Sequence, residues 1–254
     1  MAGNRPYVVV NMAMTADGKV DTVARRGARI STEADRRRVD ALRAEVDAVM
    51  VGGHTLLAED PRLTVRSTEL VEARRRQGRD PQPARVGVVS ALPDRETGAD
   101  LGPDSRFLGG EPARVIVLTS ERTRPAVRRR LAEAGADVVV LGNDRVDLAA
   151  ALGGLALRGI GRLLVEGGGT LVAELLRLGL VDEVQLFVGP LIFGGREAPT
   201  PVEGPGFGAD TAVALRPAGV MDLGPAGVVL RYTVAAGDPA PPPDPPGPAD
   251  RRGQ

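Results

Sequence analysis

Short apolar runs alternate with amphipathic helical segments along most of this chain, and this alternation constrains the fold more than any other feature. Such a pattern is typical of α/β proteins, because a helix carries the chain back between neighbouring parallel strands. Strands are expected at residues 7–14, 47–51, 85–89, 114–118, 138–141, 162–165, 184–188 and 228–234. We therefore expect a single α/β domain over residues 5–236, with a mostly parallel central sheet flanked by helices.

The helices are predicted from apolar periodicity and from residues that cap helix ends. Thr32 precedes a segment in which Val39, Leu42 and Val46 share one face, and Asp35 is expected to complete a capping box with Thr32. Further helices are expected at residues 54–59, 125–134 and 146–157, and another is expected to begin at the glycine-rich turn at 166–170. The charged segment 67–83 is expected to be a surface helix or loop.

Composition excludes several classes of function. The 33 basic and 33 acidic residues balance, so no broad positive surface favours nucleic acid or an anionic membrane as a partner. With no cysteine and one histidine, the chain has no ligand set for a zinc centre, and we expect no metal site. The lack of cysteine and of a signal-peptide layout fits a cytoplasmic protein. The Pro-rich residues 237–254 are expected to be a disordered tail.

The strongest chemical signal is the sequence EGGGT at residues 166–170, which follows a strand and opens a helix. Consecutive glycines let backbone N–H groups approach an anion at the positive end of a helix. A second strand–glycine–helix junction spans residues 51–55, and both should lie at the carboxyl edge of the sheet, where α/β proteins bind ligands. A tight turn without a ligand explains one junction equally well, whereas two favour a nucleotide-like, phosphorylated ligand.

Basic residues near the second junction could bind a substrate phosphate. Arg43, and the arginines of the segment DPRLTVR at residues 60–66, are the candidates, with a solvated surface as the alternative. Residues 74–76 and 128–130 are expected to face water, and His54 is expected to be a solvent-facing loop residue. The sequence DGK at residues 17–19 is either a plain turn or a means of holding a lysine near a substrate oxygen.

Several segments, taken in order, resemble the reductase family of riboflavin biosynthesis. They are MTADGK (14–19), RIST (29–32), LR (42–43), DAVMVG (47–52), DPRLTVR (60–66), LVEGGGT (164–170), GLVDE (179–183) and PLIFGG (190–195). The family includes stand-alone pyrimidinone 5′-phosphate reductases and the C-terminal domain of a bifunctional deaminase-reductase. The resemblance implies a dihydrofolate-reductase-like fold, a homodimer, NADPH as cofactor, and hydride transfer to C1′ of the imine form of a phosphorylated ribosylamino-pyrimidine.

The resemblance also implies roles for individual residues. Those that match the family's NADPH-binding positions are Arg29, Thr55, Glu59, Ser90, Gly167, Gly168, Gly169 and Thr170. Those that match its substrate-binding positions are Lys19, Arg43, Leu63, Arg66 and Glu166, with the arginines as phosphate partners. Lys19 and Glu166 are also implied in catalysis, and Asp17 in proton handling. Glu59 and His54 depart from the family, which commonly has an aspartate and a small residue at these positions.

Two other functions stay open. The first is a reductase of the same fold that acts on a pterin or another pyrimidine, which Arg43 and Arg66 disfavour because such a ligand has no ribose phosphate. The second is a non-catalytic nucleotide-binding module, which would not need Lys19 and Glu166. Within the favoured function, the diamino and the deaminated pyrimidine are both possible substrates, and NADPH is preferred to NADH only through the resemblance.

Overall fold

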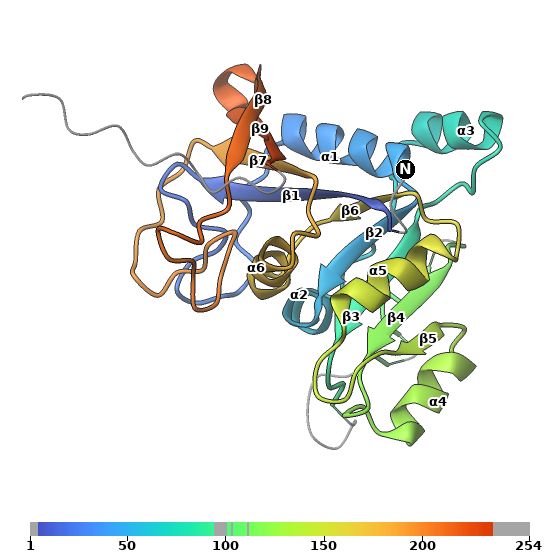
Figure 1. The fold of residues 1–254 in the computed structure, drawn as a ribbon. Helices are drawn as coiled ribbons and strands as arrows, with labels where there is room; N and C mark the ends of the chain where they lie inside the picture. The colour runs from blue at the N-terminus through green and yellow to red at the C-terminus, as the bar shows by residue number, and fades with distance from the viewer. Residues whose placement is uncertain (1–4, 94–100, 103, 111, 236–254) are drawn as a thin grey trace, which may run out of the picture.

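All strands of the described residues, 5–93, 101–102, 104–110 and 112–235, lie in one sheet (Figure 1). In this computed structural model the spatial order is β5 (Asp137–Val140), β4 (Val115–Thr119), β3 (Ala84–Val89), β2 (Ala48–Gly52), β6 (Arg162–Val165), β1 (Tyr7–Thr15), β7 (Glu183–Gly189), β9 (Val228–Val234) and β8 (Leu215–Asp222). In this spatial order, every neighbouring pair from β5 through to β7 is parallel. At the other end, β9 pairs antiparallel with β7, and β8 pairs antiparallel with β9. The expected α/β fold with a mostly parallel sheet is confirmed.

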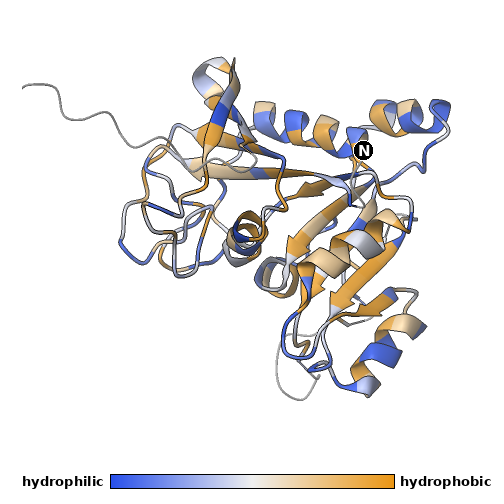
Figure 2. Ribbon diagram, in the orientation of Figure 1, coloured by the Kyte–Doolittle hydropathy of each residue, from blue (hydrophilic) through white to orange (hydrophobic). Residues whose placement is uncertain are grey.

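Helices cover both faces of the parallel strands, which explains why these strands are continuous apolar runs. The helices α5 (Leu148–Ala156) and α6 (Gly169–Arg177) pack on one face, against side chains such as Val10 and Met50. The helices α2 (Gly53–Glu59) and α4 (Pro125–Glu133) pack on the other face, against side chains such as Val49. Figure 2 shows that the central strands are largely apolar, whereas the helices beside them contain both apolar and polar residues.

The helix α1 (Glu33–Glu45) begins where the sequence predicts. The Thr32 hydroxyl accepts a hydrogen bond from the backbone N–H of Asp35 at 3.4 Å. The reciprocal half of the predicted capping box is wrong, because the Asp35 carboxylate instead accepts hydrogen bonds from the Arg38 guanidinium at 2.7 and 2.9 Å. Asp35 is fully buried, so the nearby cation stabilises its charge more than a backbone N–H alone would.

The charged segment 67–83 contains the helix α3 (Thr68–Arg76), and one of its arginines is not exposed. Arg74 is only 2% exposed, so its predicted position in water is wrong. Its guanidinium donates to the backbone carbonyls of Ala44 and Val46 at 2.8 Å each, and to that of Asp80 at 2.8 Å. Carbonyls at the end of a helix lack partners inside it. Arg74 therefore caps α1 and joins it to α3.

The strand β8 is not predicted from the sequence. All its residues are exposed, and among the described strands it pairs with β9 alone, to which the short 3₁₀ turn η1 (Gly224–Ala226) connects it. A strand with no buried face needs no alternation of apolar and polar residues. Pro217 within β8 also argues against a strand, because proline is rare inside strands. The predicted tail, 237–254, lies outside the described residues, as does part of the irregular segment 91–112.

Candidate active site

The two glycine junctions meet at the carboxyl edge of the sheet, as the sequence predicts. Strands β2 and β6 are neighbours, and the Gly52 N–H donates to the Gly167 carbonyl at 3.0 Å. Gly167 and Gly168 have φ angles of 143° and 87°, which side chains on L residues disfavour. A Cβ on Gly168 would lie 3.1 Å from the Gly52 Cα. Only glycine fits this turn, from which α6 begins.

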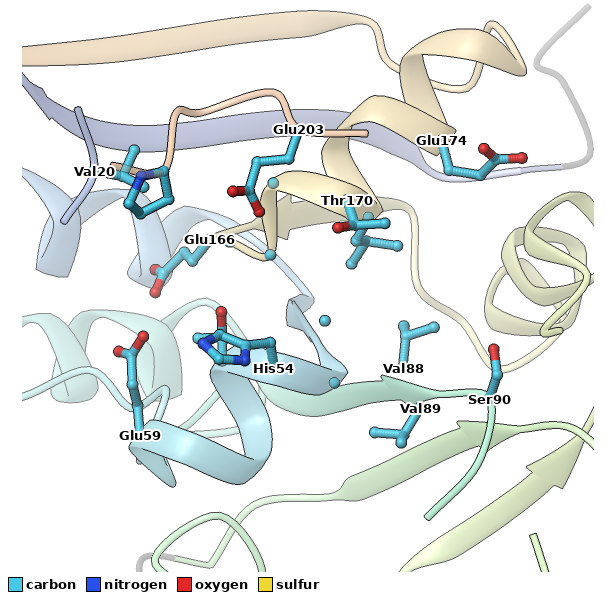
Figure 3. A pocket seen from close by; sticks show the side chains of 18 of the residues that line it. Val20, His54, Glu59, Val88, Val89, Ser90, Glu166, Thr170, Glu174 and Glu203 are labelled. Atoms are coloured by element: carbon cyan, nitrogen blue, oxygen red, sulfur yellow. The ribbon is translucent and has the colours of Figure 1, made fainter. Parts of the chain in front are cut away.

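A cleft of about 750 Å³ opens over these turns, within the size range of small-molecule and cofactor sites. The carboxyl ends of β1, β2, β3 and β6 border it, together with the first turns of α2 and α6 (Figure 3). The residues predicted for NADPH or substrate that line it are Thr55, Glu59, Ser90, Glu166, Gly167, Gly168, Gly169 and Thr170. Most of the predicted cofactor residues, from segments far apart in the sequence, are thus brought to one cavity.

The Glu59 carboxylate and the Asp21 carboxylate are both in this cleft. Loss of hydration in the cleft, followed by repulsion from Asp21, raises the pKa of Glu59 above its ordinary value, although Glu59 keeps contact with solvent. Desolvation acts in the same direction on Asp21, but hydrogen bonds from the backbone N–H groups of Gly27, Ala28 and Thr22 lower its pKa overall. Asp21 is therefore the carboxylate of the two that ionises first.

Glu166 pairs with Arg43 where the cleft meets a smaller cavity of about 220 Å³. The Arg43 guanidinium donates to both Glu166 oxygens, at 2.7 and 2.6 Å, and to the Thr64 carbonyl at 2.9 Å. Burial lowers the pKa of Arg43, but the Glu166 carboxylate outweighs this effect and the pKa is raised. The sequence predicts that Arg43 binds phosphate, but in the structure its guanidinium already binds the Glu166 carboxylate. Arg66 also lines the smaller cavity.

The remaining predicted site residues line neither cavity. Asp17 accepts hydrogen bonds from the Thr15 hydroxyl at 2.5 Å and from the backbone N–H groups of Gly194 and Phe193, and these bonds lower its pKa. The Lys19 Nζ donates to the Ala198 carbonyl at 3.3 Å. Arg29 is exposed on the loop between β1 and α1. Leu63 is 2% exposed and has a backbone φ of 51°. Their functional roles stay predictions.

Comparison with known proteins identifies the family. The family model described as the RibD C-terminal domain matches residues 6–229. This chain belongs to the RibD C-terminal domain family. Proteins named 2,5-diamino-6-ribosylamino-4(3H)-pyrimidinone 5′-phosphate reductase are 46% identical over 203 residues in Archaeoglobus fulgidus and 44% identical over 205 residues in Methanothermobacter thermautotrophicus. These alignments cover 80% of this chain, and 89% and 86% of the two relatives.

A solved structure of the RibD family has the same fold. Acinetobacter baumannii RibD, form 2, superposes with a TM-score of 0.74 at 25% identity and covers 92% of this chain. This chain spans 59% of that longer protein. The dihydrofolate-reductase-like fold implied by the resemblance is therefore confirmed, as is membership of the riboflavin-biosynthesis reductases.

The RibD-type cleft also contains residues that the sequence did not reveal. His54 belongs to the first turn of α2 and lines the cleft, so its expected loop position is wrong although it is exposed. Arg25, which donates to Glu203 at 3.1 Å, lines the cleft together with that carboxylate. Arg122 and Arg145 line the end near Ser90. The three arginines and Glu203 come from loops with no periodic pattern, so only the folded chain brings them together.

Neither a metal-binding cluster nor a membrane-spanning helix occurs in the described part of this RibD-family chain. Within it, no group of three or more histidine, aspartate or glutamate side chains could hold a metal ion. No helix among the same residues is long and apolar enough to cross a membrane.

Proposed function

We propose that this chain is the NADPH-dependent reductase of riboflavin biosynthesis that converts a ribosylamino-pyrimidine 5′-phosphate into its ribitylamino form. The observation that carries the proposal is the position of Glu166 between two cavities. One is the cleft lined by the glycine turns, and the other is the smaller cavity lined by arginines. A dinucleotide and a phosphorylated substrate would thus meet at Glu166. Relatives named as this reductase support the assignment.

The large cleft fits a nicotinamide dinucleotide. Its glycine turn lines the cleft with backbone atoms alone, and backbone N–H groups at the N-terminus of α6 suit a phosphate. The hydroxyls of Thr55, Ser90 and Thr170 lie along the same cleft and can donate to phosphate or ribose oxygens. We therefore assign NADPH to this cleft, with Arg29 outside its lining residues.

The smaller cavity fits the phosphate of the substrate. Arg36, Arg66 and Ser31 line it together with Arg43. Arg36 donates to Glu33 and to the Ser31 carbonyl, and Arg43 is held by Glu166. This leaves Arg66 as the cation whose guanidinium makes no hydrogen bond or ion pair within the described part of the chain. We infer that Arg66 leads phosphate binding, and that Arg43 supports it while orienting Glu166.

The proposed reaction balances as a two-electron reduction of an imine. When bound, NADPH supplies a hydride, and it leaves as NADP⁺. The hydride would add to C1′ of the ring-opened imine. The π bond between C1′ and the nitrogen would break, and the nitrogen would take one proton to give the ribitylamine. Asp17, with its lowered pKa and its position outside both cavities, is poorly suited to donate that proton. We therefore assign the proton to water, and orientation of the substrate to Glu166.

We further propose that the protein is a homodimer in the cytoplasm, as the family resemblance implies. The edge strand β8 carries Val220 and Met221, which are 70% and 43% exposed. Exposed apolar side chains on a sheet edge fit a surface that a second copy covers. Sedimentation velocity of the purified protein tests this part of the proposal, and a monomer at micromolar concentration would contradict it.

The reductase proposal is tested by following NADPH absorbance with purified protein and each of two substrates, the diamino and the deaminated ribosylamino-pyrimidine 5′-phosphate. Oxidation of NADPH with either substrate would establish the activity and identify the substrate. Reduction of a pterin without phosphate, and of neither pyrimidine, would favour the altered-substrate alternative. Binding of NADPH without turnover of any compound would favour a binding module.

A further inference from the structure

The cleft continues past Ser90 to an end formed by two loops. One loop follows β4 and contains Arg122, and the other follows β5 and contains Arg145. Strands β3, β4 and β5 are neighbours, so their carboxyl ends converge on this part of the cleft. Figure 3 shows Ser90 at the opposite end of the cavity from Glu166. The two arginines therefore lie at the end farthest from the proposed substrate.

Both loops are hydrogen-bonded to Ser90. The Ser90 carbonyl accepts from the Ser120 hydroxyl at 2.6 Å, and Ser120 in turn accepts from the backbone N–H of Arg122 at 3.3 Å. On the other side, the Ser90 hydroxyl accepts from the backbone N–H of Val146 at 3.1 Å, next to Arg145. The backbones that carry the two arginines are thus held at one serine before any ligand binds, which lowers the cost of binding an anion between them.

Neither guanidinium has a partner among the described residues. Within the described residues, the side chains of Arg122 and Arg145 make no hydrogen bond or ion pair, whereas Arg25 in the same cleft is paired with Glu203. Two carboxylates also line this side of the cleft, Asp144 and Glu174, and Glu174 already binds Arg177 at 3.2 Å. As far as the described residues go, this end of the cleft therefore presents two cations without a partner, and these suit a doubly charged phosphate monoester.

The direction of a bound dinucleotide follows from the two ends of the cleft. The nicotinamide must reach the substrate beside Glu166, and the pyrophosphate fits the glycine turn at 167–170 between the ends. The adenosine then extends toward Ser90. NADPH differs from NADH only by a phosphate on the 2′ oxygen of this adenosine.

We propose that Arg122 and Arg145 bind the 2′-phosphate of NADPH and so determine the preference of this protein for NADPH over NADH. The inference rests on the proposed function, because it assumes that a nicotinamide dinucleotide occupies the cleft. It assigns cofactor selection to two loop arginines outside the glycine turn. Arg122 and Arg145 select the cofactor, while the turn binds the pyrophosphate that both cofactors share.

Equilibrium binding tests this inference without turnover. The titrations use the wild type, the single variants Arg122→Ala and Arg145→Ala, and the double variant, with NADPH, NADH, 2′,5′-ADP and 5′-AMP as ligands. The preferences for NADPH over NADH, and for 2′,5′-ADP over 5′-AMP, should fall about tenfold or more in the double variant, while NADH affinity changes less than about twofold. Arg129→Ala, an exposed arginine on α4 outside the cleft, is the matched control.

The failures of the two proposals are distinguishable. If the double variant keeps the wild-type preference, or loses affinity for NADPH and NADH equally, the inference is wrong while reductase turnover still supports the function. If wild-type protein binds neither dinucleotide and turns over neither pyrimidine substrate, the proposed function fails and the inference with it. NADH affinity and the circular dichroism spectrum of each variant show that a changed preference does not come from unfolding.

Discussion

Two glycines with nearly the same backbone φ allow strain and crowding to be measured separately. Gly168 has a φ of 87° and Gly135 a φ of 89°. A Cβ at Gly168 would lie 3.1 Å from Gly52, whereas a Cβ at Gly135 would meet nothing within 4 Å. We expect Gly135→Ala to cost about 1–2 kcal/mol of unfolding free energy from strain alone. Gly168→Ala should cost about 1–3 kcal/mol more, because it also crowds the turn.

Urea denaturation of both glycine variants measures these costs, and an NADPH titration measures binding. Gly168→Ala should weaken NADPH binding, because the turn that would bind the phosphates is displaced, whereas Gly135→Ala should leave binding unchanged. Equal loss of stability in the two variants would show that the contact with Gly52 relaxes freely, and unchanged NADPH binding in Gly168→Ala would contradict the assignment of the turn.

The Arg43–Glu166 pair is the second test at the residue scale. The two side chains are 13% and 10% exposed, so Arg43→Ala leaves a nearly buried carboxylate without its partner. We expect a loss of about 3–5 kcal/mol of unfolding free energy. Arg37→Ala on the same helix removes an arginine whose side chain is 70% exposed and should change stability by less than about 0.5 kcal/mol. Chemical denaturation of both variants compares these values.

The same variant separates substrate binding from cofactor binding. Since Arg43 orients Glu166 and lines the smaller cavity, Arg43→Ala should raise the KM for the pyrimidine substrate much more than the Kd for NADPH. Fluorescence titration with NADPH and steady-state kinetics measure the two quantities. An equal loss of both affinities would remove Arg43 from the substrate site.

At the scale of elements, Arg74 determines how α1 and α3 are joined. Arg74→Met keeps most of the apolar stem but removes the guanidinium from the carbonyls of Val46 and Asp80, whereas the Ala44 carbonyl keeps a hydrogen bond from Arg79 at 3.1 Å. We expect a loss of about 2–4 kcal/mol in urea denaturation. Arg76→Met, an exposed arginine in the same helix, should cost less than about 0.5 kcal/mol. Similar costs for the two variants would show that the buried guanidinium contributes nothing specific.

At the scale of the whole molecule, the cleft opposes the ionisation of Glu59. Because its pKa is raised in the folded state, the free energy of unfolding falls as pH rises from the ordinary glutamate value of 4.5 through the pKa of Glu59. Glu59→Gln removes this effect. The variant should match the wild type in stability below pH 4.5 and exceed it near about pH 7.

Urea denaturation at several pH values gives this comparison. Glu45→Gln, which replaces an exposed carboxylate at the end of α1 outside the cleft, is the control. A stability difference between wild type and Glu59→Gln that does not change with pH would contradict the raised pKa. NADPH at 100 times its Kd stabilises the folded state by about 2.7 kcal/mol, because it binds only that state. It should therefore raise the free energy of unfolding of every variant that still binds it, at each pH.

The local sequence determined most of the elements and their order. Apolar runs predicted the parallel strands because strands buried on both faces need continuous apolar side chains, and glycine pairs predicted the two turns because few other residues adopt their backbone geometry. Family motifs added the cofactor residues, most of which line one cleft. The strand β8 was missed because an exposed edge strand carries no such pattern.

Only the tertiary structure decided which charges meet. Arg43 and Glu166 are 123 residues apart in sequence, and Arg25 and Glu203 are 178 apart, so no local pattern links them. Arg74 resembles its exposed neighbours in sequence, yet it is buried because α3 packs beside the end of α1. The sequence by itself determines conformations that depend on neighbouring residues, whereas the pairing and burial of charges depend on which loops and helix faces the sheet brings together.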